Sequence, residues 1–321
     1  MGSVAELLAK RLVFGIATLW VISLLVFSAV NLLPGDLADA ILGQGATPEA
    51  VAAFRAELGL DQPVASRYLN WVADILHGDL GRSLANDRPI SELVAGRLAN
   101  TVRLAILAAF IAIPAGVGLG ILATVYRDRP FDRATTTASL IAISFPEFFT
   151  AYILVALFSV TLGWLPAVAI ETRGGGWQQA LREIALPALT LALAVVGYVL
   201  RMTRAAIVNV MAAPYIEMAQ LKGASPLRIV TRHALPNALS PIINVVIINL
   251  AYLVVGVVVV EVVFVYPGLG QLLVDSVSKR DIPVVQACCI IFAATYVLLN
   301  LLADILSVLS NPRLRRPRQQ V

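Results

Sequence analysis

The stretch Leu104–Tyr126, LAILAAFIAIPAGVGLGILATVY, decides the fold class, because it contains no Asp, Glu, Lys or Arg. A helix needs roughly 20 mostly apolar residues to cross the hydrocarbon core of a bilayer, which is about 30 Å thick. The composition agrees: 59% of the 321 residues are hydrophobic and 14% are charged, whereas soluble proteins have roughly 45–50% apolar and about 25% charged residues. This apolar surplus needs lipid to cover it. The sequence therefore predicts an integral membrane protein.

Further charge-free windows are long enough to span, and together with the first they predict an all-α protein with six transmembrane helices. The third window is expected to extend backward past Glu147 toward Ala134, and the fourth to continue past Arg201. The prolines and glycines inside these spans predict close packing against protein as well as lipid. The further windows are Leu12–Gly35, Phe148–Ile170, Ile184–Leu200, His233–Val260 and Ile282–Ala303.

Basic residues near the spans predict the orientation, because Lys and Arg resist translocation. If both termini are cytoplasmic, most of the 24 Lys and Arg lie inside, whereas residues 34–103 carry more acids than arginines and face outward. The net charge of +4 then reflects the cytoplasmic fringe, and no nucleic-acid partner is inferred from it. The first window is longer than the 7–15 apolar residues typical of a signal peptide, so we expect it to remain as a span.

The chain divides into four segments by composition. Residues 1–33 hold the N-terminal segment and first span, and residues 34–97 form an extracytoplasmic loop with two short helices. Thr47-Pro48-Glu49 begins the first of these helices and Gly59 ends it, and the second ends at Gly78. Residues 98–307 hold spans two to six, with spans two to five as the core and a cytoplasmic loop at 208–236; residues 308–321 form a basic cytoplasmic tail.

The cytoplasmic loop between the fourth and fifth spans has the pattern of two short helices. Pro214 begins the first, and Gly223 breaks it where a positive φ costs least. Ser225 and Pro226 begin the second, which is expected to end at Leu235-Pro236. Two helices meeting at a glycine form a compact wedge suited to docking. Its apolar side chains Ile216, Ala219 and Leu227 are expected to point to one side.

This loop resembles the EAA loop of binding-protein-dependent ABC importer permeases, whose pattern is Glu-Ala-Ala-x3-Gly-x9-Ile-x-Leu-Pro. The matching residues are Glu217, Ala219, Gly223, Leu235 and Pro236. Met218 replaces the first alanine of the pattern and His233 the isoleucine, while the glycine break and the Leu-Pro pair are intact.

Other stretches along the whole chain resemble the dipeptide and oligopeptide (peptide/nickel) permease subfamily. Their order and spacing together make the resemblance specific, although each is weak alone. They are Leu33-Pro34-Gly35-Asp36, Ala46-Thr47-Pro48-Glu49, Leu58-Gly59-Leu60-Asp61, Gly78-Asp79-Leu80-Gly81, Arg97-Leu98-Ala99-Asn100-Thr101, Val260-Glu261-x-Val263-Phe264-x-x-Pro267-Gly268-Leu269-Gly270, Arg280-Asp281-x-Pro283-Val284-Val285-Gln286 and Asn311-Pro312-Arg313.

The resemblance implies a type I ABC importer permease fold in the bacterial inner membrane. It implies as partners a second homologous permease, two ATP-binding cassette subunits that dock on the EAA loops, and an extracytoplasmic binding protein that delivers short peptides. ATP and Mg would bind the partner ATPases, and this chain would hold no cofactor. By the same resemblance Glu217 would pair with a basic group of the ATPase and Gly223 would set the wedge angle; a solvated first-turn acid is the alternative for Glu217.

The residues themselves argue against an enzyme. None of the lysines, Lys10, Lys222 and Lys279, follows a glycine as a P-loop requires. His77 and His233 are expected on opposite sides of the membrane, and adjacent Cys288 and Cys289 lie within the sixth span, so no metal or nucleophile site is predicted.

Polar residues within the spans are candidates for the translocation pathway. A carboxylate near mid-membrane is costly, so Glu147 should face a cavity or a partner, where it could contact a peptide ammonium group; a hydrogen-bonded side chain at a subunit interface is the alternative. Ser144, Tyr198, Asn244 and Asn249 could line the same pathway, or hydrogen-bond between helices.

Near the outer surface, the sequence places a second acid. Glu261 lies about one bilayer thickness from the start of the fifth window, and with Gly268 and Gly270 it is expected at an outer gate or interface.

Three rival functions stay open. The same architecture could carry a nickel chelate, glutathione or an opine-like conjugate. A stand-alone ion-coupled transporter should show inverted repeats and intramembrane ion ligands, of which Glu147 is an isolated example. A structural membrane scaffold would not need the wedge loop.

Overall fold

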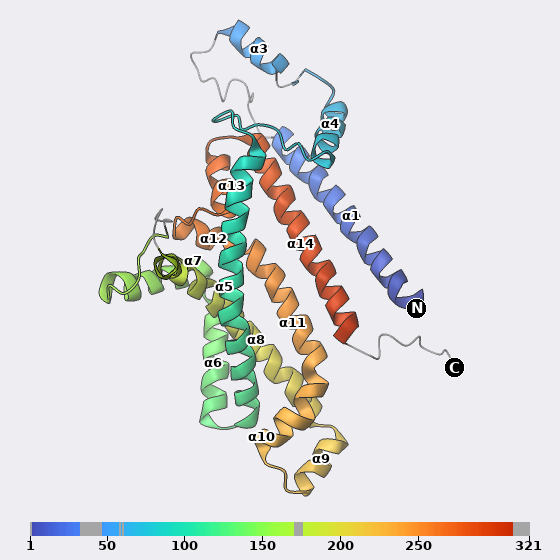
Figure 1. The fold of residues 1–321 in the computed structure, drawn as a ribbon, viewed down its shortest axis with the longest axis vertical. Coiled ribbons are helices and arrows are strands. Elements are labelled where there is room, and N and C mark those ends of the chain that lie inside the picture. The colour runs from blue at the N-terminus through green and yellow to red at the C-terminus, as the bar shows by residue number, and fades with distance from the viewer. Residues whose placement is uncertain (1, 33–46, 58, 60, 170–175, 311–321) are drawn as a thin grey trace.

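The computed structural model describes residues 2–32, 47–57, 59, 61–169 and 176–310. Within them the structure is helical, apart from an isolated antiparallel bridge between Arg82 and Pro89. The helices (Figure 1) are α1 (Gly2–Asn31), α3 (Pro48–Glu57), α4 (Val64–Leu76), α5 (Ile90–Val125), α6 (Pro130–Ser144), α7 (Glu147–Leu154), the π-helical η1 (Val155–Thr161), α8 (Trp177–Met211), α9 (Pro214–Leu221), α10 (Pro226–Arg228), the π-helical η2 (Ile229–Ala234), α11 (Leu235–Val255), α12 (Val257–Val263), α13 (Leu269–Ser278) and α14 (Ile282–Ser310).

Some residues singled out in the sequence lie outside the described part of the chain. These are Leu33-Pro34-Gly35-Asp36, Ala46, Leu58, Leu60, the end of the third window at Ile170, and the tail from Asn311.

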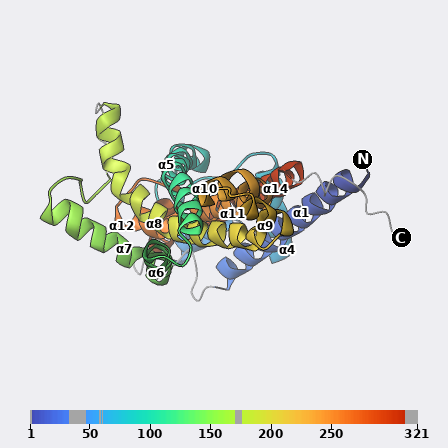
Figure 2. The same cartoon turned by 90° about the horizontal axis from the view of Figure 1, so that it is seen from below.

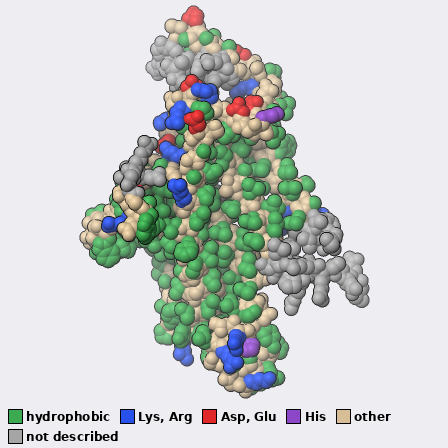
Figure 3. Space-filling model, viewed as in Figure 1, with side chains coloured by type: hydrophobic (Ala, Val, Ile, Leu, Met, Phe, Trp, Pro, Cys, Tyr) green, Lys and Arg blue, Asp and Glu red, His purple; other side chains and the backbone are tan. Residues whose placement is uncertain are grey.

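Among the described residues, five helices are long and apolar enough to cross a membrane, and a bent pair brings the number to six when it is taken as one span. The spans are Leu8–Asn31, Ile90–Val125, the pair Pro130–Ser144 and Glu147–Thr161, Trp177–Met211, Pro226–Val254 and Ile282–Leu306. In Figure 3 hydrophobic side chains cover the middle of the visible face and charged ones gather toward its two ends. The predicted all-α fold with six spans is therefore confirmed, with the third span divided in two.

The third window is not the continuous helix Phe148–Ile170 that we expected. The α6 helix ends at Ser144, α7 begins at Glu147, and the pair is bent by 108°. Phe145 takes the extended conformation (φ −82°, ψ 134°), because a following proline disfavours the helical region for the residue before it. Pro146, which we expected to be accommodated within the span, therefore sets the break. In Figures 1 and 2 α7 points away from the bundle.

The fourth and fifth windows also differ from their predicted bounds. The α8 helix continues through Pro187 from Trp177 to Met211, so the loop after it is shorter than expected. The helix leading into the fifth span does not end at Leu235-Pro236, because η2 continues directly into α11. A π-helical turn widens the backbone just before Pro236, which has no N–H to donate. At its other end α11 stops at Val255, before the predicted limit of Val260.

Close approach of α5 and α8 holds the centre of the bundle. A Cβ on Gly116 would lie 2.8 Å from the Val199 Cβ, and one on Gly120 would lie 2.8 Å from the Leu200 carbonyl oxygen. Small residues one turn apart thus let the two backbones pack at short range, as in other membrane helix pairs. A Cβ on Gly118, between them, would meet no atom within 4 Å, so this residue faces away from the contact.

The helix α4 packs on the C-terminal end of α1 (Figure 1). Tyr68 lies edge-on to Phe27 with 5.4 Å between ring centroids, and its hydroxyl is 2.8 Å from the Ser23 Oγ. The predicted helix ends in this segment are confirmed: the Ala50 N–H donates to the Thr47 Oγ1 at 3.3 Å, and Gly59 and Gly78 have φ of 62° and 84°. Elsewhere α1 lies at the edge of the bundle beside α14 (Figure 2).

Candidate functional site

The loop between α8 and α11 folds as two short helices that meet at Gly223. Pro214 is in the first turn of α9, and Gly223 ends it with φ 75°. The Gly223 N–H donates to the Gln220 carbonyl at 2.9 Å and the Ala224 N–H to the Ala219 carbonyl at 3.2 Å, which satisfies the last carbonyls of the helix. The Ser225 Oγ then accepts from the Arg228 N–H at 3.4 Å and caps α10. The predicted wedge is confirmed.

The inner face of this wedge is anchored in the bundle. Ile216 is fully buried and Ala219 nearly so, in a hydrophobic cluster with side chains from α8, η2 and α11. Leu227, by contrast, is 54% exposed. The expectation that Ile216, Ala219 and Leu227 point to one side was therefore wrong, because the first two face the bundle. The cluster also contains Ile207, Ile229, Val230, Ala234, Ala238 and Ile242.

The outer face of the wedge combines apolar and charged side chains. Glu217 is exposed in the first turn of α9, and Lys222 and Arg228 are exposed beside the bend. The apolar side chains exposed on this face are Tyr215, Met218, Leu221 and Leu227. Figure 1 shows α9 and α10 at one end of the bundle, opposite α3 and α4. Leu235 is half-buried and Pro236 is exposed where α11 begins.

An ion pair that the sequence did not reveal joins α6 to α8 above this wedge. The Arg204 Nε and NH2 donate to the two carboxylate oxygens of Asp132 at 2.6 and 2.7 Å. Asp132 is buried and also accepts from the Asp128 N–H at 2.9 Å. A two-pronged guanidinium–carboxylate contact fixes both distance and orientation. Movement of the end of α8 that leads into the wedge would therefore carry α6 with it.

Near the middle of the bundle, Glu147 is paired with a residue from another helix. The Tyr252 hydroxyl of α11 donates to the Glu147 Oε1 at 2.9 Å. Glu147 is half-buried at the start of α7, and Tyr252 is exposed in the isolated chain. Tyr252 was missed in the sequence, although it is two turns along α11 from Asn244 and hence on the same face.

The other pathway candidates divide into two groups. Tyr198 and Asn244 are exposed on α8 and α11. Ser144 and Asn249 bond to their own helices: the Ser144 Oγ donates to the Leu140 carbonyl at 2.7 Å, and the Asn249 Nδ2 to the Val245 carbonyl at 2.8 Å. Asn249 is also buried. The structure thus pairs Glu147 with Tyr252 and does not bring the predicted set into one hydrogen-bonded cluster.

Away from the wedge, Glu261 is a buried carboxylate that caps α13. Its Oε2 accepts from the Gly270 N–H at 2.7 Å and the Gln271 N–H at 3.1 Å, in the first turn of α13. Its Oε1 accepts from the Thr101 Oγ1 at 2.6 Å, and that hydroxyl in turn accepts from the Leu269 N–H at 2.8 Å. The carboxylate therefore ties α5, α12 and α13 together.

The surroundings of Glu261 shift its acidity. The residue lies in α12, beyond the end of the fifth span at Val254. Burial raises the pKa of the Glu261 carboxyl to about 6, while the hydrogen bonds from Thr101, Gln271 and Gly270 act in the opposite direction. Glu261 thus lies against Gly268 and Gly270, which the sequence placed together, and its carboxylate caps α13.

The sequence matches two family profiles that together cover most of the chain. Residues 116–316 match the binding-protein-dependent transport system inner membrane component, and residues 4–105 match the N-terminal part of a binding-protein-dependent transport system membrane component. The chain belongs to this permease family. It is accordingly an inner-membrane permease subunit of an ABC importer.

Relatives of similar length support this assignment. The permease is 41% identical over 312 residues to a provisionally named peptide transport system permease protein of Brucella abortus (strain 2308), covering 96% of this chain and 98% of that protein. It is 40% identical over 306 residues to the glutathione transport system permease protein GsiC of Salmonella typhi, covering 95% and 97%.

Solved structures show the same fold. The permease superposes on a chain of the MetNI methionine ABC transporter with a TM-score of 0.58 at 18% identity, covering 68% of this chain and 96% of that one. A chain of an amino acid ABC transporter gives a TM-score of 0.55 at 16% identity, covering 68% and 94%. The type I permease fold expected from the sequence is thereby confirmed. Among the residues that the structure describes, no group of three or more His, Cys, Asp and Glu is placed to hold a metal ion.

Proposed function

We propose that this permease forms half of the pathway through which an ATP-driven importer carries short peptides, which an extracytoplasmic binding protein delivers. One relative is named for peptides, which supports this cargo class, and another is named for glutathione. A second permease would complete the pathway, and two ATPase subunits would supply the work. Glutathione, nickel chelates and opine-like conjugates are the alternative cargoes.

The observation that carries the coupling part of the proposal is the two-sided wedge at Gly223. Its inner face is buried against α8 and α11, so a force applied to it would reach both spans without being absorbed by the loop. Its outer face presents Met218, Leu221 and the Glu217 carboxylate to whatever lies beyond the membrane surface. An ATPase subunit would bind this outer face, and Ala219 would serve as part of the anchor. Rigid-body movement of this kind is a common form of transporter switching.

For cargo recognition we propose the Glu147–Tyr252 pair. A carboxylate at membrane depth needs a partner, and here that partner is a phenol hydroxyl at 2.9 Å. A peptide ammonium could replace the Tyr252 hydroxyl as the hydrogen-bond donor to the Glu147 carboxylate, or both groups could donate to it. Tyr198 and Asn244, both exposed, would lie along the same passage.

Uptake assays on the assembled transporter test this assignment. In vesicles that contain the transporter with its native partners, a free dipeptide should be imported, and its N-acetylated form should compete at least tenfold less well. Glu147→Gln should remove that preference, whereas Tyr252→Phe, which keeps the carboxylate, should retain it.

Two results would contradict the proposal. Unchanged discrimination by Glu147→Gln would exclude the ammonium contact and leave the transport function standing. Import of neither dipeptides nor glutathione by transporter that still hydrolyses ATP would exclude the cargo class.

A further inference from the structure

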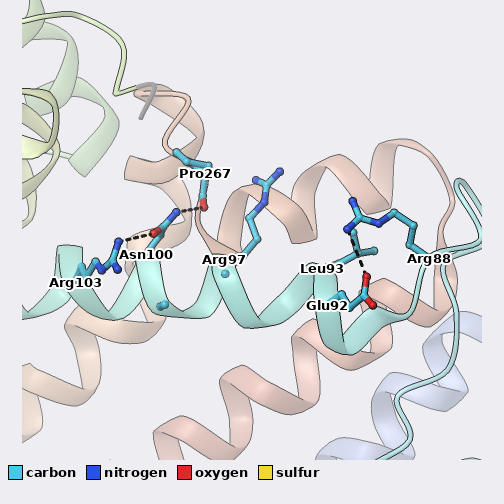
Figure 4. A pocket seen from close by; sticks show the side chains of 9 residues that line it. Arg88, Glu92, Leu93, Arg97, Asn100, Arg103 and Pro267 are labelled. Atoms are coloured by element: carbon cyan, nitrogen blue, oxygen red, sulfur yellow. Dashed lines mark hydrogen bonds and ion pairs between the residues drawn. The ribbon is translucent and has the colours of Figure 1, made fainter. Parts of the chain in front are cut away.

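A cavity of about 460 Å³ lies at the outer end of α5, where that helix meets the loop between α12 and α13. Three arginines, Arg88, Arg97 and Arg103, line it, with Glu92, Asn100 and Pro267. Figure 4 shows Glu92, Arg97, Asn100 and Arg103 along one stretch of α5, with Arg88 just before that helix and the Pro267 carbonyl hydrogen-bonded to Asn100. It is separate from the Glu147–Tyr252 pair and from the wedge at Gly223.

The described lining of this cavity carries three arginines and one carboxylate. Arg88 is 3.5 Å from that carboxylate, which belongs to Glu92. Arg97 interacts electrostatically with the buried Glu261 carboxylate, and Figure 4 shows its guanidinium pointing away from Glu92 and Asn100. The Asn100 side chain is fixed, since its Nδ2 donates to the Pro267 carbonyl at 3.1 Å and its Oδ1 accepts from Arg103 at 3.4 Å. The cavity therefore has arginines in its lining around an Asn100 side chain that hydrogen bonds hold in place.

The height of the cavity matches a lipid headgroup. Arg103 directly precedes the charge-free window that begins at Leu104, so it lies at the edge of the hydrocarbon core. Arg97 is six residues earlier, about 9 Å farther along the helix at a rise of 1.5 Å per residue. The polar layer of a bilayer lies at this level.

An exposed apolar stripe continues from the cavity into the membrane. Ile106 follows Arg103 by three residues, and Phe110 follows Ile106 by four. These spacings place all three side chains on one face of α5. Ile106 is 63% exposed and Phe110 is 77% exposed. A water-soluble anion or an acidic protein surface would use the arginines but not this stripe, whereas a phospholipid would use both.

We propose that this cavity binds one anionic phospholipid, with its phosphate between Arg97 and Arg103 and an acyl chain along Ile106 and Phe110. Guanidinium groups suit phosphate because they donate paired hydrogen bonds and are weakly hydrated. The inference needs only that α5 crosses a bilayer, so it does not depend on the cargo or on which end of the chain faces the cytoplasm.

Gly96 makes the proposal testable without disturbing the fold. It is in the lining of the cavity, and a Cβ added to it meets no atom within 4 Å. Gly96→Glu and Gly96→Gln add side chains of nearly equal size that differ in charge. Repulsion of a phosphate should therefore appear in the first variant and not in the second, while crowding would affect both.

Native mass spectrometry of the purified full-length chain measures the binding directly. Detergent-solubilised protein is mixed with phosphatidylglycerol or with phosphatidylcholine of the same acyl chains. The wild type should retain phosphatidylglycerol at least fivefold more strongly. Arg97→Gln and Arg103→Gln should each weaken its retention about fivefold, as expected for one basic residue at an anionic membrane surface. Arg82→Gln, which removes an exposed arginine outside the cavity, should change nothing.

Two further arms separate the possible sources of the phosphate. Soluble glycerol phosphate should not displace the lipid, because it has no acyl chain to lie on the apolar stripe. If it does so, the site takes free phosphate and the lipid proposal is wrong. The proposal is also overturned if the Arg97 and Arg103 variants retain phosphatidylglycerol as well as Arg82→Gln does, or if Gly96→Gln weakens retention as much as Gly96→Glu.

Discussion

Gly268 has no room for a side chain, because a Cβ at this position would lie 2.0 Å from the Glu261 Oε1. Its backbone is extended, with φ −99° and ψ −177°, so its conformation suits any residue. Glycine is therefore required at this position because the Glu261 carboxylate approaches so closely, and not because of the backbone conformation. The approach lets the loop wrap the carboxylate, so that the N–H groups of Gly270 and Gln271 reach its Oε2.

Gly268→Ala should destabilise the protein by about 3 kcal/mol, because the new methyl group must displace a buried, hydrogen-bonded carboxylate. The thermal unfolding midpoint in detergent measures this. Gly118→Ala is the matched control, since a Cβ there meets nothing within 4 Å. Equal midpoints for the two variants would contradict the packing described here.

The acidity of Glu261 predicts a pH dependence of stability. Burial raises its pKa from 4.5 to about 6, so the folded state holds a proton that the unfolded chain releases. This contribution is fully present below pH 4.5 and is lost as the pH rises through about 6. The free energy of unfolding should fall by about 2 kcal/mol across that interval. Glu261→Gln, which can still accept an N–H bond, should unfold with a smaller pH dependence there; an unchanged profile would assign the effect to other groups.

The ion pair between Asp132 and Arg204 should hold α6 and α8 together. Asp132→Ala leaves a partly buried guanidinium without its carboxylate and should cost roughly 3 kcal/mol. The double variant with Arg204→Ala should recover part of this loss. Asp128→Asn provides a comparison, because its contact with Arg127 is exposed and 3.7 Å long and asparagine tolerates the φ of 64° at this position; it should cost less than about 1 kcal/mol. Additive effects of the two single changes would show that the pair is not coupled.

Gly223 sets the angle of the wedge through its φ of 75°, and a Cβ there meets no atom within 4 Å. Gly223→Ala should therefore cost about 1–2 kcal/mol through backbone strain alone, whereas Gly223→Asn should cost less because asparagine tolerates this conformation. Peptide imported per ATP hydrolysed, measured in vesicles, should fall more for alanine than for asparagine. If alanine leaves both stability and this ratio unchanged, the angle of the wedge does not matter for coupling.

Local chemistry made much of the fold predictable from sequence. Charge-free windows locate spans because lipid excludes charge, and Pro214, Gly223 and Ser225 each act on the backbone within a few residues. Pro146 is visible in the sequence, but it was interpreted as a proline that the third span tolerates without a break. Whether a proline bends or breaks a span depends on what neighbouring helices supply, and a single sequence does not contain that information.

The paired residues of the candidate site were harder to predict. Tyr252 and Glu147 are 105 positions apart, and Arg204 and Asp132 are 72 apart, so no local spacing indicates either contact. The side on which Leu227 lies was predicted wrongly for a related reason. A short amphipathic helix has an apolar face whether it docks outward or inward, and the bundle, absent from the local pattern, decides which way that face points.

We propose that the outer face of the wedge binds a separate ATPase, and photocross-linking from single cysteines in native membranes tests this binding. With Cys288 and Cys289 replaced by alanine, single cysteines are placed at exposed Met218 and Leu221 and at buried Ile216. A benzophenone label attached to each cysteine should, on irradiation, cross-link the first two positions, and not Ile216, to an ATPase chain, with a yield that changes when ATP is added. Cross-linking of positions 218 and 221 to lipid-embedded proteins alone, or to no protein, would show that this face does not bind an ATPase.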